Sequence, residues 1–232
     1  MRSSHPPLST RYAADVGLDV PLGHDRRPTW RGRVHLIALL VAVPAMAALV
    51  AVADGTRARI GCIVYALGMC TMFGVSVAYH RWVHGLRTRA AWRRLDHAAI
   101  FLAISGSATP FVLVAMPTRT GNVLVATIWL TTLPGIVLKL GRWEHGDALG
   151  TTLYFLLSLQ CALVLPALFR YAGLAPVLLS VVSGLIYVAG AICFGLKVPR
   201  LRPGVFGFHE AWHTATLVAA STHFVAVWLT VT

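Results

Sequence analysis

The stretch VHLIALLVAVPAMAALVAVA, from Val34 to Ala53, contains twenty residues without one Asp, Glu, Lys or Arg. An α-helix rises about 1.5 Å per residue, so about twenty apolar residues cross the hydrocarbon core of a bilayer. Similar runs follow this stretch to the end of the chain, with only short polar breaks between them. The stretch therefore predicts the first of a series of membrane-spanning helices.

The composition of the whole chain also indicates a membrane protein. Of its 232 residues, 57% are hydrophobic and 12% are charged, whereas soluble domains carry about 25% charged residues. The net charge of +12 comes almost entirely from arginines, which lie between the apolar runs rather than along one face. This pattern is typical of membrane topology and of attraction to anionic lipid headgroups. We therefore expect membrane lipids as partners, and no nucleic acid.

Seven apolar runs are long enough to span a bilayer, so we predict an all-α bundle of seven transmembrane helices. The expected spans are roughly Val34–Ala53, Ile60–His80, Asp96–Met116, Asn122–Leu140, Thr151–Phe169, Leu174–Leu196 and Val205–Val231. The polar residues 1–33 are expected to form a disordered cytoplasmic tail, and residues 34–232 a single seven-helix domain. Four prolines fall inside spans, where we expect kinks that neighbouring helices accommodate: Pro44, Pro110, Pro134 and Pro166.

The distribution of basic residues predicts the orientation of the bundle. Sixteen lysines and arginines lie in the N-terminal tail and in the breaks after the second, fourth and sixth spans, against four on the opposite side. Lysine and arginine are enriched in cytoplasmic loops. We therefore expect a cytoplasmic N-terminus and an outward C-terminus in a multi-pass protein of the cell membrane.

Few ionisable residues occur inside the spans, and each is a functional candidate because burying charge in a membrane is costly. The second span ends with Ser76 and His80, and the third begins with Asp96. The seventh span carries His209 and His213 near its start. Because consecutive spans run in opposite directions, all five residues are expected at a similar depth near the cytoplasmic side.

Three histidines at one depth match the ligand set of an open zinc site, which has three nitrogen ligands and a fourth position for water. His209 and His213 are four residues apart and share one helix face, as do Ser76 and His80. We therefore predict Zn²⁺ bound by His80, His209 and His213, which lowers the pKa of its water toward about 7. Asp96 is expected to hold or deprotonate that water, and Ser76 to form a hydrogen bond to it or to a ligand carbonyl.

The remaining histidines near span ends are more typical of hydrogen-bonded boundary residues than of metal ligands. We expect this for His35, His84 and His145. His97, next to Asp96, is expected at a helix end, with a partner of the metal ligands or a fourth ligand as alternatives. His223 lies about 15 Å along the helix from His213, at 1.5 Å per residue, so we expect an interhelical hydrogen bond there.

Residues 209–213, HEAWH, also fit the H-E-x-x-H pattern of zinc peptidases, in which the glutamate acts as base. The extended form of that pattern has glycine and histidine where this chain has Thr216 and Ala219. No Asp or Glu follows Glu210 to supply a carboxylate ligand. The third ligand must therefore come from upstream, where His80 fits. Glu210 is expected off the shared histidine face, as a secondary acid or an interfacial residue.

Three motifs occur in the second, third and seventh spans: SVAYHRWVH (residues 76–84), RRLDHAAIFLAISGSATPF (93–111) and GFHEAWHTATLVAASTHF (207–224). Together with seven spans and an inward N-terminus, they resemble the bacterial hemolysin III family. That family is the prokaryotic branch of the progestin and adipoQ receptor (PAQR) proteins. The resemblance covers the chain from about residue 34 to its end. It implies that the three histidines bind zinc, with Ser76 and Asp96 as polar partners near a zinc-bound water.

The resemblance leaves two kinds of function open. In related seven-helix proteins the zinc site is associated with hydrolysis of an amide bond in ceramide-like lipids, which favours a zinc-dependent hydrolase of lipid amides or esters. The alternative is a non-enzymatic membrane sensor or regulator with structural zinc, or a cytolytic protein as the family name suggests. A structural zinc site normally has four protein ligands, and the sequence offers three, which favours catalysis. A transporter is disfavoured because the polar groups lie in one leaflet and no inverted repeat is visible.

Overall fold

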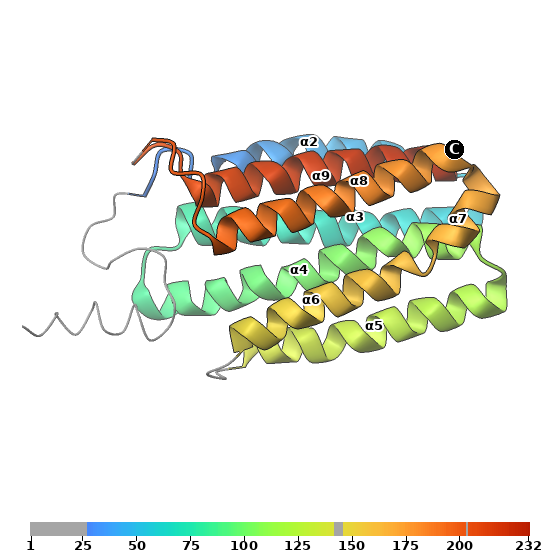
Figure 1. The fold of residues 1–232 in the computed structure, drawn as a ribbon, viewed down its shortest axis with the longest axis horizontal. Coiled ribbons are helices and arrows are strands. Elements are labelled where there is room, and N and C mark those ends of the chain that lie inside the picture. Colours follow the sequence, from blue (N-terminus) through green and yellow to red (C-terminus); the bar gives the residue numbers. More distant parts are fainter. Residues whose placement is uncertain (1–26, 142–145, 203) are drawn as a thin grey trace, which may run out of the picture.

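A computed structural model describes residues 27–141, 146–202 and 204–232, most of which are helical (Figure 1). Residues 1–26, the larger part of the expected tail, lie outside the described residues. The elements are α2 (Arg33–Val52), α3 (Gly55–Val77), the π-helical turn η1 (Ala78–Trp82), α4 (Leu86–Ala115), α5 (Thr118–Leu140), α6 (Gly146–Ala162), α7 (Leu165–Ala172), α8 (Leu174–Gly195) and α9 (Phe208–Val231).

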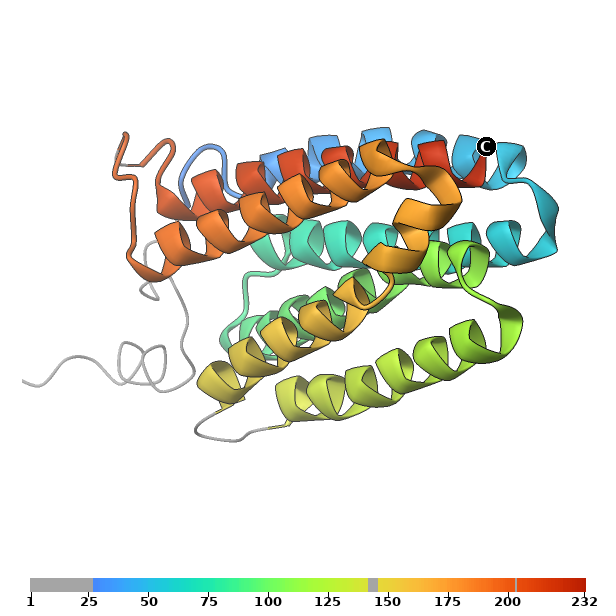
Figure 2. The ribbon, with the colours of Figure 1, turned by 45° about the vertical axis from the view of Figure 1, so that its right-hand side comes forward.

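Seven segments of the described residues are long and apolar enough to cross a membrane, which confirms the predicted seven-helix bundle. Two of them are composite, because η1 continues α3, and α7 follows α6. The segments run antiparallel along the long axis of the molecule (Figure 2). The helices α2, α4, α6 and α9 all begin at one end of the bundle, on the left in Figure 1. We call this the N-terminal end.

The fifth span is not the continuous helix expected over Thr151–Phe169. α6 ends at Ala162 and α7 begins at Leu165, with a turn between them. Pro166 explains the break, because proline donates no backbone hydrogen bond and its ring clashes with the carbonyl group four residues earlier. The other three span prolines lie inside continuous helices, as predicted.

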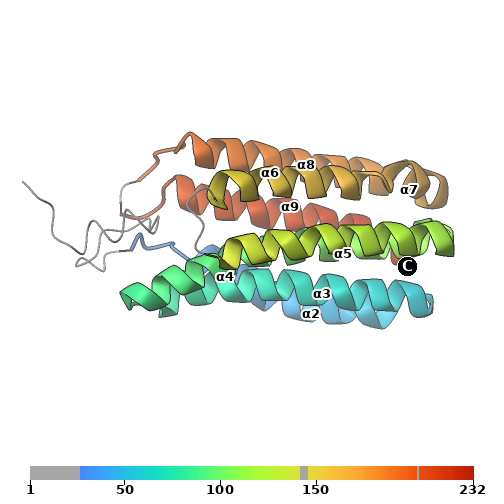
Figure 3. The same ribbon diagram turned by 90° about the horizontal axis from the view of Figure 1, so that it is seen from below.

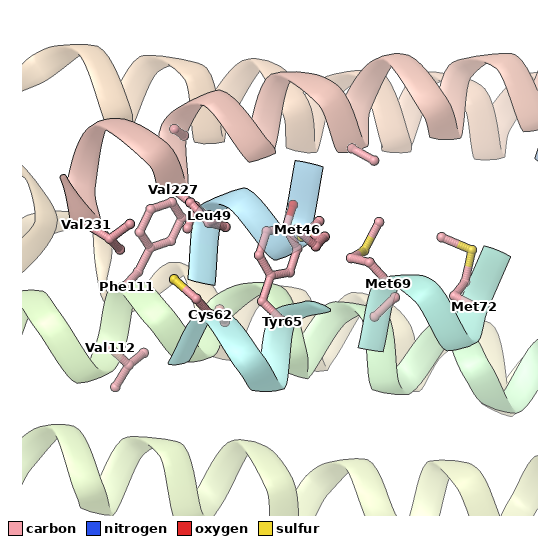
Figure 4. Packing of buried hydrophobic residues seen from close by; sticks show 14 of the residues in the cluster. Met46, Leu49, Cys62, Tyr65, Met69, Met72, Phe111, Val112, Val227 and Val231 are labelled. Atoms are coloured by element: carbon pink, nitrogen blue, oxygen red, sulfur yellow. The ribbon is translucent and has the colours of Figure 1, made fainter. Parts of the chain in front are cut away.

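The core lies where α2, α3, α4 and α9 meet. Met46 and Leu49 of α2, Tyr65 of α3, Phe111 of α4 and Val227 of α9 are all part of it (Figure 4). α4 is the central helix. Of the residues in its most apolar stretch 61% are buried, whereas in the most apolar stretch of α8 only 11% are buried. Figure 3 shows α8 and α2 at opposite edges of the bundle. α8 therefore presents most of its apolar surface outward, as a helix in contact with lipid does.

Glycines allow α3 and α4 to pack closely. A Cβ added at Gly61 would lie 2.6 Å from Cα of Pro110, and one at Gly68 would lie 2.6 Å from the carbonyl oxygen of Leu102. Lipid provides no hydrophobic driving force between helices, so membrane helices associate through such close packing of small residues. This contact fixes the position of α3 and, with it, of η1.

Gly68→Ala is expected to destabilise the bundle by about 1–3 kcal/mol, because the added methyl group meets a backbone oxygen that cannot rotate away. Gly74→Ala is the matched control in the same helix, since no atom lies within 4 Å of its added Cβ. Alanine favours the helix over glycine by about 1 kcal/mol, so the control is expected to be as stable as the wild type or more so. Unfolding in mixed micelles measures the difference, and equal stabilities would contradict the close α3–α4 contact.

Hydrogen bonds between helices add to this packing. Ser183 Oγ of α8 donates to the carbonyl oxygen of Ala219 in α9 at 2.8 Å. His223 Nε2 of α9 donates to the carbonyl oxygen of Ser107 in α4 at 3.2 Å. The second contact confirms the interhelical hydrogen bond predicted for His223.

Candidate metal centre

His80 lies in a π-helical turn at the end of the second span. η1 continues α3 without interruption, and the N–H of Val83 donates to the carbonyl of Ala78, five residues earlier, at 3.1 Å. π-turns within helices are rare and occur frequently at functional sites. The wider turn changes the direction of the His80 side chain relative to a regular α-helix. His80 is 5% exposed inside the bundle.

His209 and His213 lie on the first two turns of α9, at the same end of the bundle as η1. The chain is extended at Gly207 and enters the helix at Phe208. Both histidines are buried, and their ring centroids are 4.7 Å apart. The spacing of four residues therefore places them on one helix face, as predicted.

The three histidines meet inside the bundle. Each offers a nitrogen atom, and these atoms of His80, His209 and His213 all lie within 4.8 Å of one another. Nε2 of His80 and Nε2 of His209 are 3.3 Å apart. Two nitrogens bound to a tetrahedral zinc ion at about 2.0–2.1 Å are separated by about 3.3–3.4 Å. This pair therefore already has the spacing of two zinc ligands.

Among the buried polar atoms of the described residues that have no hydrogen-bond partner are Ser76 Oγ and His213 Nε2. Ser76 is 1% exposed and lies four residues before His80. A buried polar group without a partner is costly in a membrane interior. A metal ion would take His213 Nε2 as a ligand, and a group bound to that ion would provide a partner for Ser76. Three imidazoles are a donor set that suits Zn²⁺, so the residues fit the metal.

Glu210, the glutamate of the H-E-x-x-H pattern, is engaged outside the cluster. Its Oε1 accepts a hydrogen bond from Arg31 Nε at 2.5 Å, and its Oε2 accepts one from the N–H of Gly207 at 2.8 Å. The ion pair is enclosed, with Arg31 10% and Glu210 1% exposed. Glu210 therefore caps the start of α9 and balances the charge of Arg31.

Residues 27–32 pack against the N-terminal end of the cluster. The guanidinium group of Arg27 donates to the carbonyl oxygens of His80 and Val83, at the end of η1. Gly32 has a positive φ of 72°, and a Cβ there would lie 2.9 Å from Cβ of His80. Backbone hydrogen bonds join this segment to the loop between α8 and α9, beside which it lies in Figure 1. The last part of the expected tail is thus in contact with the metal-ligand cluster.

The sequence matches a family model described as haemolysin-III related over residues 24–224. The chain belongs to the haemolysin-III-related family. The matched residues include α2 to α8 and all three histidines of the cluster. Membership confirms the resemblance to the hemolysin III and PAQR proteins. Together with the seven spans, it identifies the chain as a multi-pass membrane protein.

The haemolysin-III-related chain is similar to proteins from bacteria, animals and plants. It is 27% identical to Hemolysin-3 of Bacillus cereus over 197 residues, which cover 83% of this chain and 86% of the relative. It is 25% identical to the human monocyte to macrophage differentiation factor over 199 residues, 84% of this chain and 80% of that protein. It is 30% identical to the heptahelical transmembrane protein ADIPOR2 of Oryza sativa subsp. japonica over 189 residues, 71% of this chain and 79% of that protein. The last name agrees with a seven-helix fold.

Asp96 lies about three turns into α4 of the haemolysin-III-related fold, because that helix begins at Leu86 rather than at Asp96 itself. α4 packs against both η1 and α9, the two elements that carry the histidines. Neither Asp96 nor His97 belongs to the described group of side chains whose ligand atoms lie within 4.8 Å. The carbonyl oxygen of His97 accepts a hydrogen bond from the hydroxyl of Tyr154 at 2.6 Å. The role expected for Asp96 beside the water therefore stays a prediction.

His35 does not have the boundary position expected for it. It is 3% exposed on the first turn of α2, and its ring contacts His213. These residues are 178 positions apart in the chain, so no spacing pattern links them. One feature of the sequence could have pointed to His35: a histidine inside an apolar span is a functional candidate by itself. His84 is exposed, and His145 lies outside the described residues.

Proposed function

We propose that the histidine cluster binds Zn²⁺ and that the protein hydrolyses an amide or ester bond in a membrane lipid. The observation that carries this proposal is the convergence of three buried histidines from two elements, with nitrogens close enough to share one ion. Three protein ligands leave a fourth position, which is the arrangement of catalytic rather than structural zinc. The charge distribution of the sequence favours a site on the cytoplasmic side.

Each side chain has a definite role in this mechanism. Bound zinc supplies a Lewis acid that polarises a carbonyl group and activates water. His80 on η1 and the two histidines on α9 hold the ion, so the packing of these elements sets its position. Ser76 donates a hydrogen bond from its buried Oγ to the substrate carbonyl oxygen or to water. Asp96 on α4 takes the proton from water and returns it to the leaving amine or alcohol.

A lipid substrate suits the position of the cluster. The three histidines are 4–6% exposed within a bundle whose helices present many apolar side chains outward. At the N-terminal end, residues 27–32 contact His80 and are joined by backbone hydrogen bonds to the loop between α8 and α9. A lipid carbonyl reaches such a depth from the bilayer itself. Exclusion of bulk water strengthens every polar contact within the site.

Asp96→Asn is expected to abolish lipid turnover and to leave the zinc content unchanged. Loss of a general base lowers the rate by about 10²–10⁴-fold, whereas Asp96 is not in the group of metal-ligating side chains. Asparagine keeps the size of the side chain and one acceptor oxygen, but it cannot take a proton at neutral pH. The measurement combines the zinc content of purified protein with fatty-acid release from ceramides and phospholipids in nanodiscs.

The matched control is Asp54→Asn. Asp54 is exposed and precedes α3 at the opposite end of the bundle, so its substitution is expected to change neither zinc nor turnover. If the wild-type protein contains zinc but hydrolyses none of the lipids, the proposed metal site stands and the proposed hydrolase activity is contradicted. The protein would then be a sensor or regulator with structural zinc. If the wild-type protein contains no zinc, both the metal site and the zinc-dependent hydrolase activity are contradicted.

A further inference from the structure

His35 contacts one of the three clustered histidines from a different helix. Nδ1 of His213 lies 2.8 Å from Nε2 and 3.0 Å from Nδ1 of His35. The ring centroids are 3.9 Å apart and the ring planes are inclined by 88°. Both side chains are less than 5% exposed, so this polar contact is shielded from water. α2 thereby joins η1 and α9 at the cluster.

The contact determines which nitrogen of His213 is available to a metal. A metal-bound imidazole uses one nitrogen, and the hydrogen bond of the other nitrogen fixes the tautomer and the ring orientation. Nδ1 of His213 is engaged by His35, whereas its Nε2 has no hydrogen-bond partner. The rings are perpendicular, and Nδ1 of His213 is almost equally distant from both nitrogens of His35, so its N–H points at the face of the His35 ring. His213 therefore keeps its proton on Nδ1 and presents the lone pair of Nε2.

His35 itself is not placed as a ligand. It is absent from the described group of side chains whose ligand atoms lie within 4.8 Å of one another. Its ring lies against Nδ1 of His213, whereas Nε2 of His213 is the nitrogen left without a hydrogen-bond partner.

The ring of His35 is held on a second side. Phe73 of α3 makes an edge contact with it, with centroids 5.2 Å apart and planes inclined by 69°. Phe73 is 2% exposed and belongs to the main core. α2 packs against both α3 and α9. His35 is therefore fixed between two helices, and its fixed ring face holds the ring of His213 in one orientation.

We propose that His35 is a positioning residue of the metal centre. The face of its ring receives the N–H of His213 Nδ1, which sets the tautomer and the orientation of that ligand and so raises the affinity for the metal. The proposal rests on the proposed zinc site and deepens it, because it makes the first helix of the bundle part of the site. Outer partners of this kind typically contribute a factor of about 10–100 to metal affinity.

Three substitutions of His35 test the proposal in full-length protein in nanodiscs, with zinc affinity measured by competition with a chelator. His35→Leu keeps much of the side-chain volume and removes the aromatic face, so the dissociation constant for zinc is expected to rise about 10–100-fold. His35→Phe and His35→Tyr keep an aromatic face at the same place. Both are expected to retain much of the affinity.

His223→Leu is the matched control. It makes the same exchange at a partly buried histidine, one that contacts Ser107 and lies about 15 Å along α9 from His213. Its zinc affinity is expected to equal that of the wild type. X-ray absorption at the zinc edge is expected to show three imidazole ligands in the wild type and in His35→Phe alike.

Different outcomes overturn different claims. Wild-type protein that binds no zinc overturns the metal site and the role of His35 together. Zinc-binding wild type with an unchanged affinity in His35→Leu overturns the role of His35 alone. The same holds if all three His35 variants lose affinity equally together with the stability of the metal-free protein, because His35 would then act through packing. A fourth imidazole that disappears in His35→Phe would make His35 a ligand.

Discussion

His213→Ala is expected to reduce the zinc content of the purified protein from about one ion per chain to background. The reason is geometric: His213 supplies one of three nitrogens that meet within 4.8 Å, and two imidazoles alone do not hold zinc against the buffer. His80→Ala and His209→Ala are expected to behave in the same way. Metal analysis after purification in a mild detergent, with gel filtration to confirm folding, measures the effect.

His223→Ala is the control for this loss of metal. His223 lies on the same helix as His213, is partly buried and makes its contact with Ser107 instead of the cluster. It is expected to retain zinc even if the smaller side chain lowers stability. Zinc that persists in His213→Ala, or that vanishes equally in His223→Ala, would contradict the assignment of the three ligands.

Glu210→Ala is expected to lower the free energy of unfolding by about 3–5 kcal/mol, because removal of one partner of a buried ion pair leaves the other charge uncompensated. Arg31 would keep its charge at 10% exposure without the oxygen that now lies 2.5 Å away. The N–H of Gly207 would also lose its acceptor at the start of α9. Thermal or detergent-induced unfolding of metal-free protein measures this effect separately from zinc.

The double variant Arg31→Met with Glu210→Leu separates the ion pair from the packing around it. Replacing both charges by apolar side chains of similar volume is often neutral, so the double variant is expected to recover most of the stability lost in Glu210→Ala. Glu210→Gln provides a further distinction. A Gln variant with wild-type stability, full zinc and no turnover would make Glu210 the catalytic base, as in the peptidase pattern, and would displace Asp96.

The number and order of the spans could be predicted because bilayer thickness imposes one length on every helix. Local backbone chemistry could be predicted less well. Pro166 ends α6, whereas Pro110 lies inside α4, and the difference depends on which neighbours accommodate the proline. The π-turn around His80 has no signal in SVAYHRWVH, since its formation depends on the contacts at the end of α3.

The meeting of the three histidines could be predicted because two of them share a helix face and the third lies at a depth set by topology. The partners of these histidines could not. His35 meets His213 only through packing of the first helix on the last, and Arg31 meets Glu210 from a segment that composition alone assigns to a polar tail. Contacts between residues so distant in the chain follow from tertiary structure, which local pattern does not encode.

The pairing of the first and last helices has a consequence for biosynthesis. Arg31 and His35 are synthesised more than 170 residues before Glu210 and His213. Until α9 is made, the charge of Arg31, just before α2, and the imidazole of His35 on α2 lack these partners, and only His80 of the three clustered histidines is in place. The cluster can therefore form only once α9 has joined the bundle. A chain that terminates before α9 lacks both the histidine cluster and the contacts that α9 makes with the first helix.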